Sequence, residues 1–379
     1  MKKNYLVTPG PTPVPPQALL AMAKPIIHHR TGQFKNILKE AVEGLKYVMQ
    51  TKNDVFIFTS SGTGAMQSAV NNILSPGDKA LVIKGGKFGE RWEEICQSYG
   101  VNVIPIDCEW GKAIDPAIIQ DKLKQDKQIK AVYTTLCETS TGVVNDIKAI
   151  GEIVAKSDAI LVVDAISGLG SVEFKADAWN VDITVAGSQK GLMLPPGLAF
   201  VGVSKKAMDL VESAKNPRYY FCYKAAKKSA DKSDTPWTPA VSLVIALVET
   251  LKMIKTETLE AALKRQKKMA DAIRKAVPAL GLTLLAPDAA SNAVTAIKLP
   301  ESIDGTELVK TMRDKYGVAI AGGQAKLKGK ICRIATMGFM TEFDVIIAIS
   351  CLEVVLKEMG YKFDLGVGVK VAQETLFKL

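Results

Sequence analysis

A lysine directly after an apolar run is the residue of this sequence best placed to act as a nucleophile. Lys190 stands in the segment Ser188-Gln-Lys-Gly191, which follows the strand-like run Ile183–Val185. Apolar surroundings disfavour the charged ammonium, so the pKa of an enclosed lysine falls below its usual value of about 10.4 and the amine becomes nucleophilic. Most lysines are solvated surface residues, but the strand before Lys190 favours an enclosed position.

An aspartate ends another apolar run. Asp164 follows Ile160–Val163, a run typical of a buried strand. Parallel α/β sheets bind ligands at the carboxyl ends of their strands, and a carboxylate buried there needs a partner. A protonated pyridine nitrogen would be such a partner, whereas a helix cap or a metal ligand would be the ordinary use of this residue. An aspartate and a lysine after neighbouring strands form the arrangement that a pyridoxal-phosphate (PLP) site requires.

A turn of small residues after a third apolar run could bind phosphate. Val55–Phe58 is followed by Ser61-Gly62-Thr63-Gly64 and then by a helix-length segment. Free N–H groups and the dipole at a helix start attract phosphate, glycines permit a close approach, and hydroxyl groups add donors. The same residues would also make a plain strand-to-helix turn. The segment is not a Walker loop, and Gln67 replaces the third glycine of GxGxxG.

Taken together, these motifs resemble the class V aminotransferases, and above all the group of alanine–glyoxylate and serine–pyruvate (or serine–glyoxylate) aminotransferases. The resemblance runs from about residue 5 to about residue 355, with its motifs in the family's order. It implies the fold of aspartate aminotransferase (PLP-dependent transferase fold type I), with a large PLP-binding domain, a small C-terminal domain, and a homodimer with shared active sites. The resembling stretches are Thr59-Ser-Ser-Gly-Thr-Gly-Ala-Met66, Val163-Asp-Ala-Ile-Ser-Gly-Leu-Gly170, Gly187-Ser-Gln-Lys-Gly191 and Pro9-Gly-Pro-Thr-Pro-Val-Pro-Pro16.

The resemblance implies a role for each matching residue. Lys190 would be the catalytic lysine that forms the Schiff base with PLP, and Asp164 would hold the pyridine nitrogen. The other cofactor-binding residues would be Ser61, Gly62, Thr63 and Gln189 at the phosphate, Phe88 and Ile166 on the two ring faces, and Thr238, which the partner subunit would lend to the phosphate. The substrate would contact Gly10, Ser140 and Arg333, of which Arg333 would grip the carboxylate. His28-His29-Arg30 also matches a family signature, without an assigned role.

The implied reaction moves an amino group from a small amino acid, alanine or serine, to a 2-oxo acid, glyoxylate or pyruvate. Lys190 would move the α-proton, first as base and then as acid, while Asp164 would keep the ring nitrogen protonated. The planar guanidinium of Arg333 suits a carboxylate, because it offers two parallel hydrogen bonds. Two departures from the family pattern concern affinity or specificity: Phe88 stands where some members have Trp, and Met337-Gly-Phe339 replaces a smaller sequence.

Three other interpretations fit part of the sequence. A cysteine desulfurase or lyase on the same fold normally has one His before the lysine and another on the ring, where this sequence has Gln189 and Phe88. An NAD-dependent dehydrogenase, suggested by Gly62-Thr-Gly64, leaves Lys190 and Asp164 unexplained. A non-catalytic partner is the third alternative, since some members of this family are labelled as soluble hydrogenase subunits; the intact Lys190 argues against it.

The elements that must position these residues alternate along the chain, which predicts an α/β fold with a mostly parallel sheet. A long helical stretch, Val241–Lys275, should have a break near Thr256 and be followed by a second α/β unit of strands Val294–Leu299 and Ile331–Ile334 and helices Gly305–Lys315 and Glu342–Glu358. We expect a large domain with an N-terminal arm (1–260) and a small C-terminal domain (261–379). The expected strands of the large domain are Val55–Phe58, Ala80–Ile83, Val101–Ile106, Ala131–Thr134, Ile160–Val163, Ile183–Val185 and Leu198–Val203, and its expected helices include Thr63–Leu74, Lys87–Ser98 and Ile147–Ala155.

Composition agrees with an ordinary globular protein. The 379 residues, 47% hydrophobic and 23% charged, suggest about two domains. The net charge of +10 and the basic, aromatic stretch Lys215–Lys232 are weak indications of nucleic acid, so no nucleic-acid partner is expected.

Prolines between Thr8 and Pro16 interrupt any signal-peptide core, and Val241–Val248 is too short to span a membrane, so we expect a cytoplasmic protein with no membrane partner. The six cysteines lack CxxC spacing and the only histidines are His28 and His29, so no metal site is expected.

Overall fold

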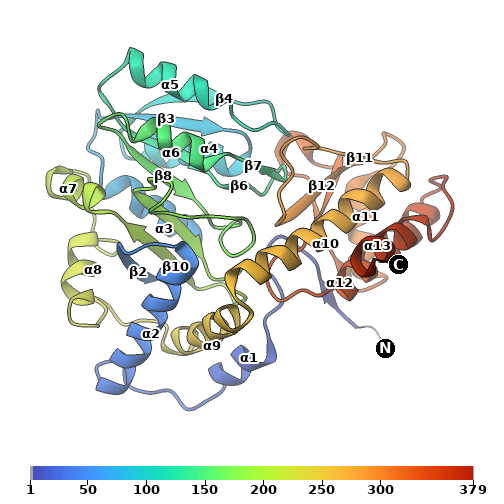
Figure 1. Ribbon diagram of the computed structural model, residues 1–379, viewed down its shortest axis with the longest axis horizontal. Helices are drawn as coiled ribbons and strands as arrows, with labels where there is room; N and C mark the ends of the chain where they lie inside the picture. Colours follow the sequence, from blue (N-terminus) through green and yellow to red (C-terminus); the bar gives the residue numbers. More distant parts are fainter. Residues whose placement is uncertain (1–2, 379) are drawn as a thin grey trace.

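The seven apolar runs form one sheet at the centre of the larger part of the molecule (Figure 1). The structure is a computed structural model that describes residues 3–378. The strand order is β2-β10-β9-β8-β5-β3-β4, and only β10 runs antiparallel to its neighbours. The predicted, mostly parallel sheet is therefore confirmed. The strands are β2 (Asp54–Thr59), β3 (Lys79–Lys84), β4 (Asn102–Asp107), β5 (Ile129–Thr135), β8 (Ile160–Asp164), β9 (Ile183–Gly187) and β10 (Leu198–Val203).

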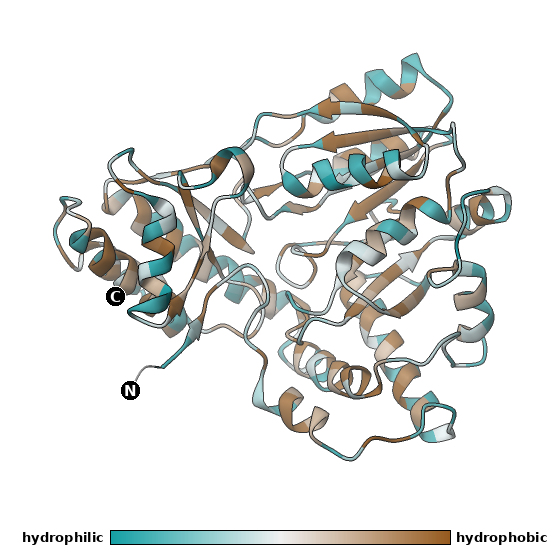
Figure 2. Cartoon of the chain, turned by 180° about the vertical axis from the view of Figure 1, so that it is seen from behind, coloured by the Kyte–Doolittle hydropathy of each residue, from teal (hydrophilic) through white to brown (hydrophobic). Residues whose placement is uncertain are grey.

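Helices cover both faces of this sheet. Successive strand residues point to opposite faces, so that Leu161 joins the hydrophobic cluster of one face and Val162 that of the other. The helices of the first face are α1 (Pro16–Met22), α2 (Gly32–Met49), α5 (Pro116–Gln125), α6 (Ile147–Val154) and α9 (Val241–Glu257), and those of the second are α3 (Gly62–Asn71), α4 (Lys87–Ser98), α7 (Lys205–Ser213) and α8 (Tyr223–Ala230). The strands are mainly hydrophobic along their length, whereas the helices carry hydrophilic outer faces (Figure 2), as expected for a sheet covered on both sides.

The C-terminal part is a second α/β unit around an antiparallel sheet, in the order β11-β12-β15-β14. Its strands and helices confirm the predicted second unit. They are α10 (Leu259–Ala279), β11 (Thr283–Leu284), β12 (Val294–Lys298), α11 (Gly305–Asp314), β13 (Val318–Ala319), β14 (Ala321–Gly322), the 3₁₀ turn Ala325–Leu327, β15 (Ile331–Ala335), α12 (Glu342–Glu358) and α13 (Val367–Phe377). The segment after Gly360, in which the sequence showed no motif, forms α13 and packs against α10 (Figure 1).

The two parts are joined by a helix break and by the N-terminal arm. The expected break near Thr256 lies at Thr258, whose φ is +71° between α9 and α10. The first strand, β1 (Tyr5–Leu6), pairs in parallel with β13 of the C-terminal part, so the arm crosses from one part to the other. The division into domains of residues 1–260 and 261–379 stays a prediction.

The direction of the strands in the large sheet decides where the functional residues meet. Strands β2, β3, β5, β8 and β9 all run in one direction, so their carboxyl ends share one edge of the sheet. The short hairpin β6 (Cys137–Glu138) and β7 (Val143–Val144) follows β5 at the same edge. Among the described residues, no helix combines the length and the apolar character that crossing a membrane requires.

Candidate active site

Lys190 lies under the N-terminal arm at the carboxyl edge of the sheet. Its ammonium group donates a hydrogen bond to the carbonyl oxygen of Pro9. Thr12 fastens the arm there: its N–H donates to the Gln189 carbonyl at 3.2 Å, and its hydroxyl donates to the Lys190 carbonyl at 3.0 Å. Gly10, at φ +132°, must lack a side chain, because a Cβ would overlap the Lys190 side chain and its amine. The predicted substrate-facing Gly10 is thus in direct contact with the predicted catalytic lysine.

Burial moves the pKa values of Lys190 and Asp164 toward each other. It lowers the pKa of the Lys190 ammonium from 10.5 to about 8, a shift that the nearby Asp164 partly offsets. It raises the pKa of the Asp164 carboxyl from 3.8 to about 7, against the effects of the Ile166 N–H and the Lys190 charge. Asp164 ends β8, and its Oδ1 accepts the N–H of Ile166 at 2.8 Å. The site therefore holds an amine that loses its proton readily and a carboxyl that takes one up readily.

The residues predicted to bind phosphate lie at the start of helix α3. Ser61 is the N-cap residue, yet its hydroxyl makes no capping hydrogen bond, and both Ser61 and Thr63 are exposed. A Cβ on Gly187 would lie 3.1 Å from Gln189 Oε1 and 3.7 Å from the N–H nitrogen of Gly62, which places the Gln189 amide beside the helix start. The structure therefore brings together Ser61, Gly62, Thr63 and Gln189.

The residues predicted for the two ring faces come from different elements. A Cβ on Gly62 would lie 2.5 Å from Ile166 Cδ1, so Ile166 packs directly against the start of α3. Phe88 lies in the first turn of α4, and the guanidinium carbon of Arg91 lies 4.8 Å from the centroid of its ring. Arg91 also donates to the hydroxyl of Thr63 at 3.2 Å. No role was assigned to Arg91 from the sequence, although it stands three positions after Phe88, where a helix presents both on one face.

Arg333 reaches the site from β15 and connects the two parts of the molecule. Its Nε and Nη2 donate to the carbonyl of Gly322 at 2.9 and 2.7 Å, and its Nη1 donates to the carbonyl of Thr139 at 2.7 Å. Both partners are backbone carbonyls rather than a carboxylate, so the guanidinium charge is not neutralised by these three bonds. Burial lowers the pKa of Arg333 from 12.5 to about 10, which leaves it cationic at neutral pH.

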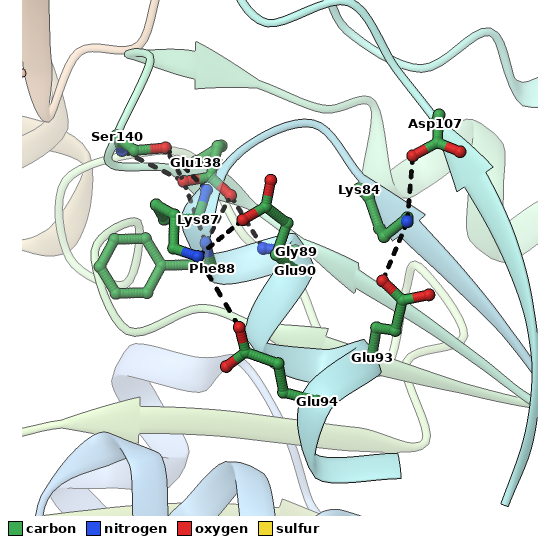
Figure 3. A network of polar contacts seen from close by, with 10 residues as sticks. All are labelled: Lys84, Lys87, Phe88, Gly89, Glu90, Glu93, Glu94, Asp107, Glu138 and Ser140. Atoms are coloured by element: carbon green, nitrogen blue, oxygen red, sulfur yellow. Dashed lines mark hydrogen bonds and ion pairs between the residues drawn. The ribbon is translucent and has the colours of Figure 1, made fainter. Parts of the chain in front are cut away.

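Ser140, predicted to face the substrate, is fully buried and bonded to Glu138. Its hydroxyl donates to Glu138 Oε1 at 2.6 Å and accepts the N–H of Lys87 at 3.0 Å (Figure 3). Glu138 is a second carboxylate of this site that received no role from the sequence. The sequence did contain a pattern that could have identified Glu138, because this residue follows the apolar run at β5 much as Asp164 ends β8.

Thr238 is exposed in the loop between α8 and α9, where it lines a small cavity with Thr59 and Trp237. The loop is held by Arg30, which pairs with Asp234 at 2.6 Å and donates to the Thr235 carbonyl at 2.9 Å. The signature His28-His29-Arg30 thus has a structural contact with the loop that carries Thr238.

The residues at this edge of the sheet fit PLP. The end of the Gln189 amide assigned as Oε1 is buried without a hydrogen-bond partner among residues 3–378, which is the condition expected of a group that meets a ligand. Turning the amide over would present its NH₂ group to a phosphate there. The start of α3 offers N–H groups and hydroxyls for a phosphate, Asp164 offers a carboxyl for a ring nitrogen, and Lys190 offers an amine. Together they supply groups for the phosphate, the ring nitrogen and the aldehyde of the cofactor.

Comparison with protein families identifies the class. The family described as Aminotransferase class-V matches residues 4–345. The chain therefore belongs to the class V aminotransferases and is a PLP-dependent aminotransferase. The resemblance inferred from the motifs, the fold class and the cofactor are confirmed.

Relatives along nearly the whole length differ in their named amino donors. The soluble hydrogenase 42 kDa subunit of Anabaena cylindrica is 45% identical, with 98% of both chains covered. The L-aspartate–glyoxylate aminotransferase of Paracoccus denitrificans is 39% identical, with 98% of this chain and 96% of that one covered. The serine–glyoxylate aminotransferase of Methylorubrum extorquens is 37% identical, with 99% and 96% covered. The solved structure of the Bacillus subtilis ureidoglycine–glyoxylate aminotransferase has a TM-score of 0.95 at 29% identity, with 100% of this chain and 99% of that one covered.

Two substitutions should each remove one pH dependence of stability from the cofactor-free protein. The folded pKa of Lys190 (about 8) lies below its ordinary value of 10.5, so the unfolded chain binds more protons between these values and stability rises with pH there. The folded pKa of Asp164 (about 7) lies above 3.8, so stability falls as pH rises between these values. Lys190→Met should abolish the rise and Asp164→Asn the fall, each with a slope of up to about 1.4 kcal/mol per pH unit.

Denaturant unfolding at a series of pH values measures both slopes. The wild-type protein is the reference, and each variant serves as the control in the pH range where the other variant should differ. If the free energy of unfolding of variants and wild type changes with pH in parallel through both ranges, the assigned burial of these groups is contradicted.

Proposed function

We propose that this aminotransferase takes the amino group of a small amino acid, alanine or serine, and transfers it to glyoxylate or pyruvate. The observation that carries the proposal is the contact of the Pro9–Gly10 backbone with the Lys190 amine. Because this backbone closes over the reacting nitrogen, it leaves little room for a bulky donor side chain. The serine–glyoxylate relative supports the same donor and acceptor classes.

The chain's own residues would divide the work as follows. Ser61, Gly62, Thr63 and Gln189 would hold the PLP phosphate, Asp164 the ring nitrogen, and Phe88 and Ile166 the two faces of the ring. When bound, PLP supplies a ring that takes up the negative charge left by removal of the substrate's α-proton. The amine of Lys190, with its lowered pKa, would accept that proton and return it.

Arg333 would bind the substrate carboxylate. Nη1 and Nη2 each use one N–H on a backbone carbonyl, and each guanidinium nitrogen of this type carries a second N–H. The carbonyls of Gly322 and Thr139 therefore hold the guanidinium in place while it keeps its charge. This arrangement suits a planar, two-point grip on a carboxylate.

Aspartate is a second candidate donor, which Arg91 favours. Arg91 contacts Phe88 and Thr63, two residues proposed to bind PLP, and its positive charge also acts on Lys190 and Asp164. A cation there would attract the side-chain carboxylate of an acidic donor, and one relative is named for aspartate.

A matrix of alanine, serine and aspartate against glyoxylate and pyruvate tests the proposal. We expect the highest kcat/KM with alanine or serine; a clear preference for aspartate that Arg91→Gln abolishes would replace the small-donor proposal.

Lys190→Ala should abolish transamination. Loss of the amine removes both the attachment to PLP and the proton transfer, so activity should fall by at least about 100-fold. Borohydride treatment followed by mass spectrometry should find PLP attached to Lys190 in the wild type and to no residue of the variant. Retained transamination in Lys190→Ala would contradict the assignment of Lys190 as the catalytic lysine.

Arg333→Ala should lower kcat/KM for amino acids by about 10–150-fold, the value of a lost hydrogen bond to a charged group. The variant should also lose stability, because Arg333 holds the carbonyls of Gly322 and Thr139. The two effects separate when an amino acid is compared with its amine analogue that lacks the carboxylate. Arg333→Lys should recover part of the activity, since lysine keeps the charge and lacks the planar fork. Equal losses for the amino acid and the amine would refute the carboxylate role.

We further propose a homodimer in which Thr238 of one chain reaches the phosphate of the other. Support comes from the exposed position of Thr238 and from the exposed Tyr219, stacked on Trp237 with ring centroids 4.8 Å apart. PLP affinity should therefore fall on dilution into monomers, and Thr238→Ala should weaken PLP binding without shifting the dimer equilibrium. Sedimentation and PLP titration over a dilution series measure both, and a monomer with full PLP occupancy would overturn the proposal.

A further inference from the structure

Glu138 is a buried carboxylate whose hydrogen bonds join two parts of the proposed site. It is 1% exposed. Its Oε2 accepts the N–H groups of Phe88 and Gly89 at 3.1 and 3.0 Å, and its Oε1 accepts the N–H and O–H of Ser140 at 3.1 and 2.6 Å (Figure 3). Burial raises the pKa of Glu138, while these donors act in the opposite direction. Because all four partners are donors, both oxygens serve as acceptors, as in the ionised form.

Helix α4 has no capping side chain of its own. Its N-cap residue is Gly86. The N–H of Lys87 donates to the Ser140 hydroxyl, and the next two N–H groups, of Phe88 and Gly89, donate to Glu138. A Cβ on Gly86 would overlap the carboxyl group of Glu138 and the hydroxyl of Ser140. The missing side chain therefore makes room for a carboxylate from another element, whose charge is also stabilised by the helix dipole.

The two segments that Glu138 joins both carry residues of the proposed site. The start of α4 carries Phe88, proposed to lie against the PLP ring. The segment 138–140 carries Ser140 and the Thr139 carbonyl that holds Arg333. The negative charge of Glu138 also acts on Asp164 and Arg333, where it raises both pKa values. Glu138 is thus connected to the ring side and to the carboxylate side of the site.

We propose that Glu138 is a positioning residue that holds Phe88 against the cofactor and fixes the positions of Ser140 and Arg333 relative to the cofactor. This inference rests on the proposed function of the site. Glutamine is the isosteric test, because one carboxylate oxygen becomes an NH₂ group that cannot accept a hydrogen bond. In Glu138→Gln, either the start of α4 or Ser140 loses its acceptor and faces another donor.

Glu353 provides a matched control. It is 2% exposed, lies in α12, and accepts the N–H groups of Gly366, Gly368 and Val369 at 2.6, 2.7 and 3.0 Å at the start of α13. It is therefore similarly buried and likewise accepts two N–H groups in the first turn of a helix, but it has no contact with a proposed site residue. Glu353→Gln reports what the loss of such a contact does to stability alone.

The experiment compares Glu138→Gln and Glu353→Gln with the wild type. The melting temperature of the cofactor-free protein, PLP affinity by absorbance titration, the visible circular dichroism of bound PLP, and kcat and KM at saturating PLP are measured. Both variants should melt at a lower temperature. Only Glu138→Gln should weaken PLP binding, by about 10–100-fold, change the visible circular dichroism and raise KM for the amino acid.

Three outcomes decide the inference. If Glu138→Gln lowers only the melting temperature, as Glu353→Gln does, Glu138 is an ordinary helix cap and the proposal is wrong. If Glu138→Gln does not fold, Gly86→Ala takes its place, because the added methyl group displaces the Glu138 carboxylate without removing its charge. Unchanged PLP affinity and unchanged circular dichroism in Gly86→Ala would equally overturn the proposal. Failure of the proposed function has a different result, in which the wild type itself does not transfer the amino group of alanine or serine to glyoxylate or pyruvate.

Discussion

The burial of Lys190 and Asp164 at the ends of adjacent strands is the constraint on which the rest of the site depends. A charge in apolar surroundings is costly unless a partner offsets the loss of water, so each group has a shifted pKa and its neighbours are arranged around it. The parallel direction of β8 and β9 places both groups at one edge of the sheet. The arm, with its Pro9 carbonyl on the Lys190 amine, closes that edge from the other side.

Backbone groups, rather than paired side chains, hold the other charges of the site. Arg333 rests on two backbone carbonyls, and Glu138 accepts three backbone N–H groups together with one hydroxyl. Charges held in this way stay in fixed positions without being neutralised. Their electric field therefore still acts on a bound ligand, which is what electrostatic preorganisation requires.

Much of the fold followed from local sequence. All seven strands of the large sheet were predicted within one or two residues, and α4 and α12 at their observed ends, because buried parallel strands appear as short apolar runs between amphipathic helices. The two-residue strands β1, β13 and β14 were not predicted, since so short a segment carries no periodicity. Helix α13 was missed for another reason: its start is capped by Glu353 of α12, a contact that no local pattern shows.

By itself, the sequence determined the chemistry of the site. Lys190, Asp164 and the small-residue turn at Ser61–Thr63 each follow an apolar strand, and a ligand site at the carboxyl ends of parallel strands follows from that order. Only the tertiary structure decided how these groups are held. Pro9 meets Lys190, Glu138 meets Phe88, and Arg333 meets Thr139 across long stretches of chain. Such contacts depend on how helices and loops pack against one another, and side-chain packing is not encoded in any short segment.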